Sequence, residues 1–121
     1  SALEESLALA RELSDEMGVA LALSNLSALA LESGEGARAA SLLTEALPHY
    51  RAVGDQDGLA HCLEGFAAVA ALEASGASQA AQLAGAAERL REHIGAALSS
   101  ADRARHERRV PVAAPEQPAR A

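Results

Sequence analysis

Apolar residues recur along this chain at intervals of three and four, which is the spacing of one face of an α-helix. Leu23, Leu26 and Ala30 follow that spacing, and Leu63 and Phe66 begin it again further along. Because no stretch alternates between apolar and polar residues as a half-buried strand does, the pattern predicts an all-α protein. The predicted helices cover residues 3–13, 16–33, 37–53, 56–74, 78–94 and 100–109.

Polar residues and glycines mark where these helices begin and end. Asp15 and Asp55 each precede a predicted helix, where an aspartate side chain can accept a hydrogen bond from a free N–H of the first turn. Pro48 falls inside another predicted helix and removes a backbone hydrogen bond, so a kink or an early stop near Leu47 is expected. Further breaks are expected at Gly34 and Gly36, at Ser75 and Gly76, and at Gly54 and Gly95.

The chain contains an internal repeat. RELSDEMGVALAL (residues 11–23) aligned with RAVGDQDGLAHCL (51–63) matches an arginine, an aspartate, a glycine and a leucine at one constant offset. ARAASLL (37–43) aligned with SQAAQLA (78–84) continues the match at an offset longer by one, so a single residue is inserted near residues 72–75. Since one helix pair is too small to bury its own apolar face, neighbouring pairs must stack and share a core.

Residues 22–47, ALSNLSALALESGEGARAASLLTEAL, resemble a tetratricopeptide repeat (TPR), a helix pair with alanines, leucines, an asparagine and a glycine-acid turn at set positions. The matching positions are Ala22, Leu23, Asn25, Leu26, Ser27, Gly34, Glu35, Ala39, Leu43, Ala46 and Leu47. The second unit matches through Cys62, Leu63, Gly65, Phe66, Ala67, Ala80 and Ala87. The segment AAQLAGAAERLREHIGAALSSADR is similar to the C-terminal repeat arms of large bacterial signalling ATPases that also carry transcription-regulator or nucleotide-cyclase domains.

The resemblance implies a fold of antiparallel helix pairs stacked as a short, TPR-like, right-handed solenoid. A TPR-like helical repeat domain would cover residues 1–110, and a proline-rich tail would cover residues 111–121. Within the domain the repeat units would lie at about 15–54 and 55–95, and the flanking helices at 3–13 and 100–109.

Charge separates the two parts of the chain and limits its partners. The net charge is −7; residues 1–75 hold twelve acidic residues against three arginines, and residues 76–121 hold five against seven. The acidic part would repel nucleic acid, and a basic run such as ADRARHERR is more often a solvated helix face, so we do not expect nucleic-acid contact. No apolar run reaches the roughly 20 residues that span a bilayer, so no membrane contact is expected.

Candidate chemistry centres on Asp55-Gln56-Asp57-Gly58 and the neighbouring His61 and Cys62. An EF-hand-like calcium loop needs about five oxygen ligands, and only two carboxylates are present, so a helix cap is the better interpretation. The histidine and cysteine are adjacent on a helix, about 100° apart, and cannot bind one metal ion from one face. In the repeat alignment Cys62 replaces Ala22, which favours a buried packing role. We therefore expect no enzyme: no catalytic residue, no cofactor and no metal.

A binding surface is the function that the resemblance implies. In TPR arrays the first helix of each pair lines a concave groove, and the implied partner-binding residues are Leu21, Ser24, Asn25, Ala28, Leu31, His61, Glu64, Ala68 and Leu72. The alternative is that these are ordinary exposed helix positions. An apolar or basic peptide or protein, or another part of the parent chain, would be the partner, and the exposed end helices offer a possible homodimer surface.

The expected role is a protein–protein interaction module, or scaffold, of a bacterial cytoplasmic regulator. A single cysteine, which rules out an internal disulfide, fits that reducing compartment. The alternative is a small-effector sensor arm that controls an attached ATPase, cyclase or DNA-binding domain.

Overall fold

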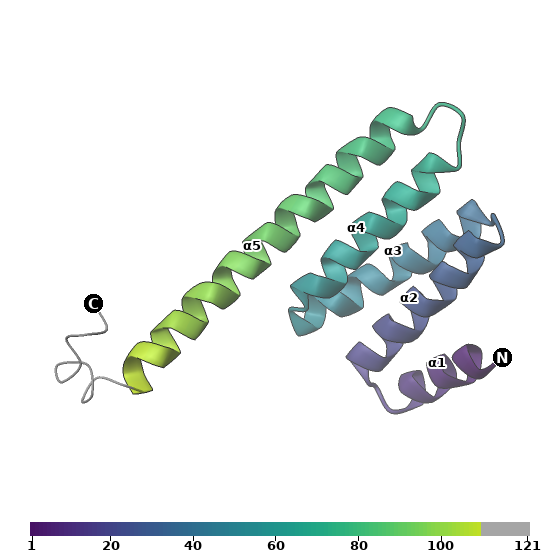
Figure 1. Ribbon diagram of the computed structural model, residues 1–121. Coiled ribbons are helices and arrows are strands. Elements are labelled where there is room, and N and C mark those ends of the chain that lie inside the picture. The colour runs from purple at the N-terminus through teal and green to yellow at the C-terminus, as the bar shows by residue number, and fades with distance from the viewer. Residues whose placement is uncertain (110–121) are drawn as a thin grey trace. The chain divides into compact units, whose positions relative to one another are not determined.

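The computed structural model describes residues 1–109, which form helices and no strand (Figure 1). The elements are α1 (Ala2–Glu12), α2 (Glu16–Glu32), α3 (Gly36–Val53), α4 (Gln56–Ala71) and α5 (Ala77–Arg109). The prediction of an all-α protein is confirmed for these residues. The chain divides into one compact unit, Ser1–Arg91, and a second unit that begins at Glu92 and holds the end of α5. The predicted proline-rich tail, residues 111–121, lies outside the described residues.

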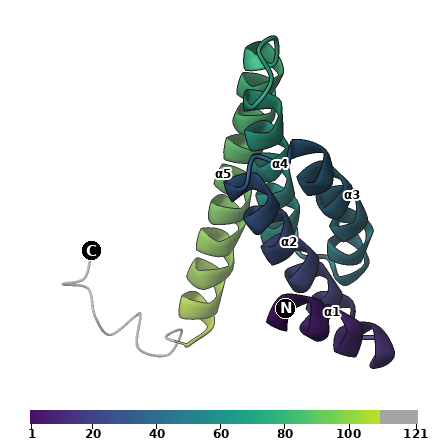
Figure 2. The same ribbon diagram turned by 90° about the vertical axis from the view of Figure 1, so that its right-hand side faces the viewer.

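Within the first unit, helices α1 to α4 each pack against the next in sequence, because short connections reverse the chain. Helix α2 contacts α1, α3 and α4, and α3 also contacts α4 (Figures 1 and 2). The core lies between these helices, and its largest fully buried side chains include Tyr50, Leu23, Leu43 and Cys62. Most of the remaining core residues are alanines, whose small side chains let helices approach closely.

The two predicted helix caps are confirmed. The Asp15 side chain accepts a hydrogen bond from the Gly18 N–H at 3.0 Å, and the Asp55 side chain accepts one from the Gly58 N–H at 3.1 Å. Their backbones are nearly identical, with φ and ψ of −87° and 93° at Asp15 and −85° and 95° at Asp55. The cluster of charged and glycine residues around Asp55 is therefore a joint between helices, built twice in the chain.

The residue before each capping aspartate has a left-handed backbone. Gly54 has φ of 70°, and its counterpart in the first joint, Ser14, has φ of 54°. This conformation costs a residue with a β-carbon about 1 kcal/mol relative to glycine. Ser14 therefore holds strain that Gly54 avoids at the same point of the repeat.

The connection between α4 and α5 carries the predicted insertion. It spans residues 72–76, whereas the matching connection between α2 and α3 spans residues 33–35. Since α4 is also one residue shorter than α2, the net insertion is the single residue predicted. Gly76 ends the longer connection, and a β-carbon there would lie 1.9 Å from the Ala70 carbonyl oxygen. Gly76 thus lies directly against the backbone at the end of α4, where any residue with a β-carbon would clash.

Helix α5 is continuous, so the predicted break at Gly95 and the separate flanking helix at 100–109 are wrong. The counterpart residue, Gly54, ends its helix because its backbone is left-handed and a capping aspartate follows. Gly95 is instead followed by Ala96 and Ala97, which cannot cap a new helix and favour continuation of the existing one. A glycine inside a helix costs only about 1 kcal/mol, which the surrounding residues outweigh.

Helix α3 continues past Pro48 to Val53, so of the two outcomes predicted near Leu47, a kink or an early stop, the early stop does not occur. The proline supplies no amide hydrogen to the carbonyl of Thr44, one turn earlier. Thr44 and Pro48 are both exposed, so water can reach that carbonyl. The turn after the proline is held in place by Tyr50, which is buried in the core.

Candidate functional site

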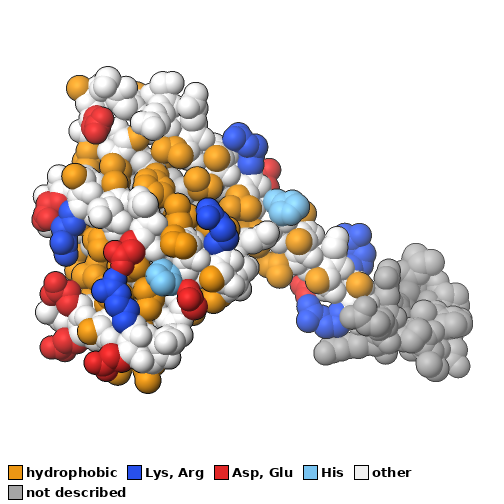
Figure 3. Space-filling view, turned by 180° about the vertical axis from the view of Figure 1, so that it is seen from behind, with side chains coloured by type: hydrophobic (Ala, Val, Ile, Leu, Met, Phe, Trp, Pro, Cys, Tyr) orange, Lys and Arg blue, Asp and Glu red, His pale blue; other side chains and the backbone are white. Residues whose placement is uncertain are grey.

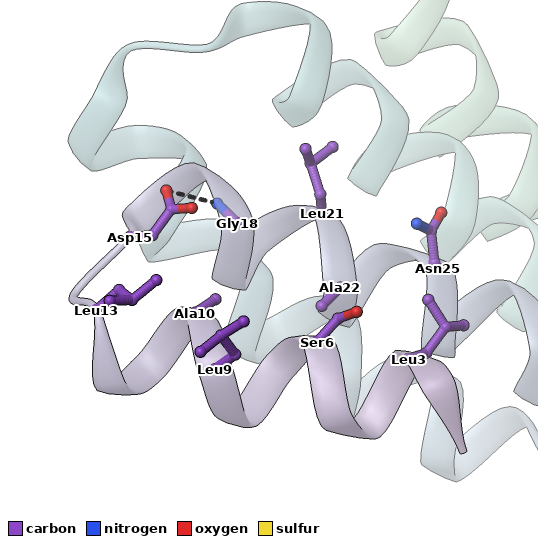
Figure 4. Close-up of a pocket in the computed structure, with 10 residues that line it drawn as sticks. All are labelled: Leu3, Ser6, Leu9, Ala10, Leu13, Asp15, Gly18, Leu21, Ala22 and Asn25. Carbon is purple, nitrogen blue, oxygen red and sulfur yellow. Dashed lines mark hydrogen bonds between the residues drawn. The ribbon is translucent and has the colours of Figure 1, made fainter.

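A hollow of about 340 Å³ lies between α1 and α2 (Figure 4). Its walls and floor are formed by Leu3, Ser6, Leu9, Ala10 and Leu13 of α1 and its C-cap, and by Asp15, Gly18, Leu21, Ala22 and Asn25 of α2 and its N-cap. We call this hollow the α1–α2 groove. A smaller hollow of about 230 Å³ lies between α4 and α5 and is lined by Phe66, Val69, Ala70, Glu73, Gln79 and Leu83.

The walls of the α1–α2 groove carry large apolar side chains that no other part of the described chain covers. Leu9, Leu13 and Leu21 are 55, 68 and 49% exposed. Single exposed leucines are common on protein surfaces, but leucines gathered around one hollow are typical of an interaction site.

The floor of the groove is low because its residues are small. A β-carbon on Gly18 would lie 2.4 Å from an Asp15 carboxylate oxygen and 3.1 Å from the β-carbon of Ala10. The end of α1 therefore meets the start of α2 closely, with Ala10 and Ala22 buried beneath the leucines. The local joint between the helices thus shapes the groove.

The lining of the groove is mostly apolar and offers few polar groups. Its one titratable side chain, Asp15, is engaged in capping α2. The other polar side chains in its lining are Ser6 and Asn25, both exposed. These residues can donate and accept hydrogen bonds, and none is a nucleophile paired with a base.

Two of the sequence-predicted site residues line the α1–α2 groove in the structure. Leu21 and Asn25 do lie together in a hollow, but its opposite wall is α1 rather than α4. Helix α1 was predicted only as a flanking helix, and its contribution through Leu9 and Leu13 was missed. A signal was present, because Leu9 lies two positions after the buried Leu7 and therefore on another side of the helix.

Ser24 was expected to face the groove, and the structure buries it instead. Its side chain is 3% exposed, and its hydroxyl lies 2.7 Å from the Tyr50 hydroxyl of α3. The backbone carbonyl of Ser24 also accepts a hydrogen bond from the Ser27 hydroxyl at 2.7 Å. The Ser24 hydroxyl is therefore the hydrogen-bond partner of the buried Tyr50 hydroxyl. Burial raises the pKa of Tyr50 above its usual value.

Glu64 is exposed but already paired within the chain. Arg91 of α5 donates from Nε and Nη2 to the two Glu64 carboxylate oxygens at 2.8 and 2.9 Å. These hydrogen bonds lower the pKa of Glu64. Arg91 also lies 3.5 Å from an Asp57 carboxylate oxygen. The Glu64 carboxylate thus joins α4 to α5.

The other predicted residues lie outside the α1–α2 groove. Ala28, His61, Ala68 and Leu72 are exposed, and Leu31 is half-buried. Leu72 lies beside the start of α3, since a β-carbon on Gly36 would be 3.3 Å from its Cδ1.

Cys62 is completely buried in the core, as the repeat alignment predicts. Burial raises the pKa of its thiol from 9.0 to about 11, so very little thiolate forms near neutral pH. Among the side chains that the structure describes, those of residues 1–105, no three His, Cys, Asp or Glu are grouped so that they could hold a metal ion.

Comparison with known proteins gives no relative: no family model matches this chain, nor does any curated protein or solved structure. In the described part of the chain, no helix combines the length and apolar character needed to cross a membrane.

Proposed function

We propose that this chain is a protein–protein interaction module whose α1–α2 groove binds apolar side chains of a partner peptide or protein. The observation that carries the proposal is the set of three half-exposed leucines, Leu9, Leu13 and Leu21, around one hollow. Full burial of a leucine contributes about 1.5–3 kcal/mol, so covering the exposed half of each contributes roughly 1 kcal/mol. Three contributions of this small size suit a weak, reversible contact.

The lining favours a peptide over a small effector. Small-molecule sites usually enclose most of the ligand and present several convergent polar groups. Here the groove is open, and its free polar side chains are Ser6 and Asn25 alone. A partner that supplies its own row of aliphatic side chains matches this surface better.

The resemblance to tetratricopeptide repeats extends the proposal to the wider fold and setting. We take the chain to be a TPR-like right-handed solenoid from a bacterial cytoplasmic regulator. The matching caps at Asp15 and Asp55, which hold the same place in the two units, support a true repeat. Sequencing the parent gene tests the setting, because a signalling ATPase domain upstream is expected.

Heteronuclear NMR tests the groove. The labelled chain would be titrated with amphipathic peptides of about four helical turns that carry leucines at helical spacing. Shifts are expected at residues lining the α1–α2 groove, and Leu21→Arg should abolish them. Leu98→Arg is the matched control, since Leu98 is 61% exposed and lies on α5. Shifts scattered over the surface, or none with any peptide, would contradict the proposal.

A further inference from the structure

The acidic residues around the α1–α2 groove point to the charge of its partner. Residues 1–32 hold six acidic residues and one arginine. The arginine, Arg11, forms an ion pair with Glu45 on α3. No other arginine, and no lysine, lies on α1 or α2 to offset the acidic residues.

Three of these acids stand next to the exposed leucines. Glu5 and Glu12 are four residues before and three residues after Leu9, so they flank it on the surface of α1. Both are exposed, and neither has a partner among the ion pairs found in residues 1–105. Asp15 lines the groove itself, at the end where α1 and α2 are connected. Figure 3 shows acidic side chains lying beside exposed hydrophobic ones over the packed helices.

The groove also indicates the conformation of its occupant. An extended strand would bring unpaired backbone N–H and C=O groups against a lining that offers few partners for them. A helix satisfies its backbone internally and presents side chains one turn apart. Leu9 and Leu13 are one turn apart on α1 and its C-cap, and Leu21 and Asn25 are one turn apart on α2. A third helix can therefore pack its side chains between the two walls.

We infer that the partner segment is a basic amphipathic helix, with aliphatic residues on one face and arginines or lysines beside them. This inference rests on the proposed function, which it makes more specific. Attraction between the positive charges of the partner and Glu5, Glu12 and Asp15 would orient the helix and speed its association. The leucines of the groove would then hold it in place. Helix α1 is 11 residues long, about 16 Å, so three turns of a partner helix fill the groove.

Two synthetic peptides test the inference. Each is a helix of about four turns with the same leucine and alanine face; one carries arginines on its polar face and the other glutamates. Fluorescence anisotropy of each labelled peptide is measured against the full chain at low and high salt. The arginine peptide should bind at least about tenfold more tightly at low salt, and the preference should shrink at high salt because exposed charges are screened.

Variants then locate the effect. The double substitution Glu5→Gln and Glu12→Gln should weaken binding of the arginine peptide about three- to tenfold. Glu88→Gln with Glu92→Gln is the matched control, because it removes two exposed acids from α5 and leaves the groove unchanged. Circular dichroism verifies that all variants keep their helix content.

The outcomes separate the two proposals. If both peptides bind equally in a manner that Leu21→Arg abolishes, the groove function stands and the inference of a basic partner is wrong. Tighter binding of the glutamate peptide also overturns the inference. If neither peptide binds, both proposals fail. If sedimentation shows that the chain alone self-associates and that Leu21→Arg prevents this, a second copy of the chain is the occupant and the inferred partner is wrong.

Discussion

At the scale of single residues, the two joints between helices differ most at the left-handed position before the cap. Ser14 occupies it in the first joint and Gly54 in the second. Ser14→Gly should raise the free energy of unfolding by about 0.5–1 kcal/mol, because glycine removes the strain of a positive φ. Urea unfolding followed by circular dichroism measures this change.

The reverse exchange serves as the control. Gly54→Ser should lower the free energy of unfolding by about 1 kcal/mol. A β-carbon at Gly54 would meet nothing within 4 Å, so the loss would be conformational rather than steric. Equal stability of all three proteins would show that the joint does not hold the strain inferred here.

Cys62 makes stability sensitive to alkaline pH. Its thiol has a pKa of about 11 in the folded chain against 9.0 for an ordinary thiol, and the pKa of Tyr50 is raised in the same direction. As pH rises above 9.0, the unfolded chain loses the thiol proton first, so the free energy of unfolding falls until the folded thiol also ionises near pH 11.

Urea unfolding at about pH 8 and about pH 10.5 measures this decline. In Cys62→Ala the decline should be smaller, with only the tyrosine contribution remaining. A decline of the same size in both proteins would mean that the thiol does not cause it.

At the scale of helices, the proline in α3 is a local weakness that the structure tolerates. Pro48→Ala restores an amide hydrogen for the Thr44 carbonyl and removes a clash within the helix. We expect an increase of about 1–3 kcal/mol in the free energy of unfolding, below the full helix-interior cost because the site is exposed. Thermal unfolding measures it, and Ala52→Pro, also on the exposed side of α3, should destabilise by about as much. A lower melting temperature in Pro48→Ala would show that the helix is adapted to its proline.

Helices whose limits carry strong local signals could be predicted from the sequence. Asp15, Asp55 and Gly54 each fix a helix end by their own chemistry, and the structure has ends at all three. Gly95 gave a false signal because it keeps the helical backbone, whereas Gly54 has a left-handed backbone and is followed by a capping aspartate. The burial of Ser24 could not be predicted from its neighbours, since it depends on the Tyr50 hydroxyl, 26 residues away in sequence.

Only one wall of the α1–α2 groove could be predicted from the sequence, for a related reason. Leu21 and Asn25 were identified from the repeat pattern on one helix. The facing wall belongs to α1, which lies outside the repeat units, so the pattern gave no indication that Leu9 and Leu13 would stand opposite Leu21. Which helices face each other depends on packing over the whole unit.

At the scale of the whole molecule, the first compact unit contains its own core. Every residue of the buried hydrophobic cluster lies within Ser1–Arg91. A chain ending after Arg91 should therefore fold, with a free energy of unfolding within about 1 kcal/mol of that of the full chain. Matched urea titrations of the two chains, with helix content followed by circular dichroism, measure this difference.

A chain ending after Gly76, which lacks the part of α5 that pairs with Glu64, provides the comparison. It loses the partly buried Leu83 and the buried Ala87 and should unfold at lower urea. Non-cooperative unfolding of the chain that ends after Arg91 would contradict a self-sufficient core.

The acidic residues beside the α1–α2 groove, Glu5 and Glu12, have a further consequence for the protein in a crowded solution. Open leucine surfaces normally make identical molecules adhere and precipitate. Here each copy presents the exposed carboxylates of Glu5 and Glu12 beside Leu9, so two copies that approach through this face repel each other. The residues that select a basic partner would thus also protect the chain's colloidal stability, and neutralising them should cost solubility even where no partner is present.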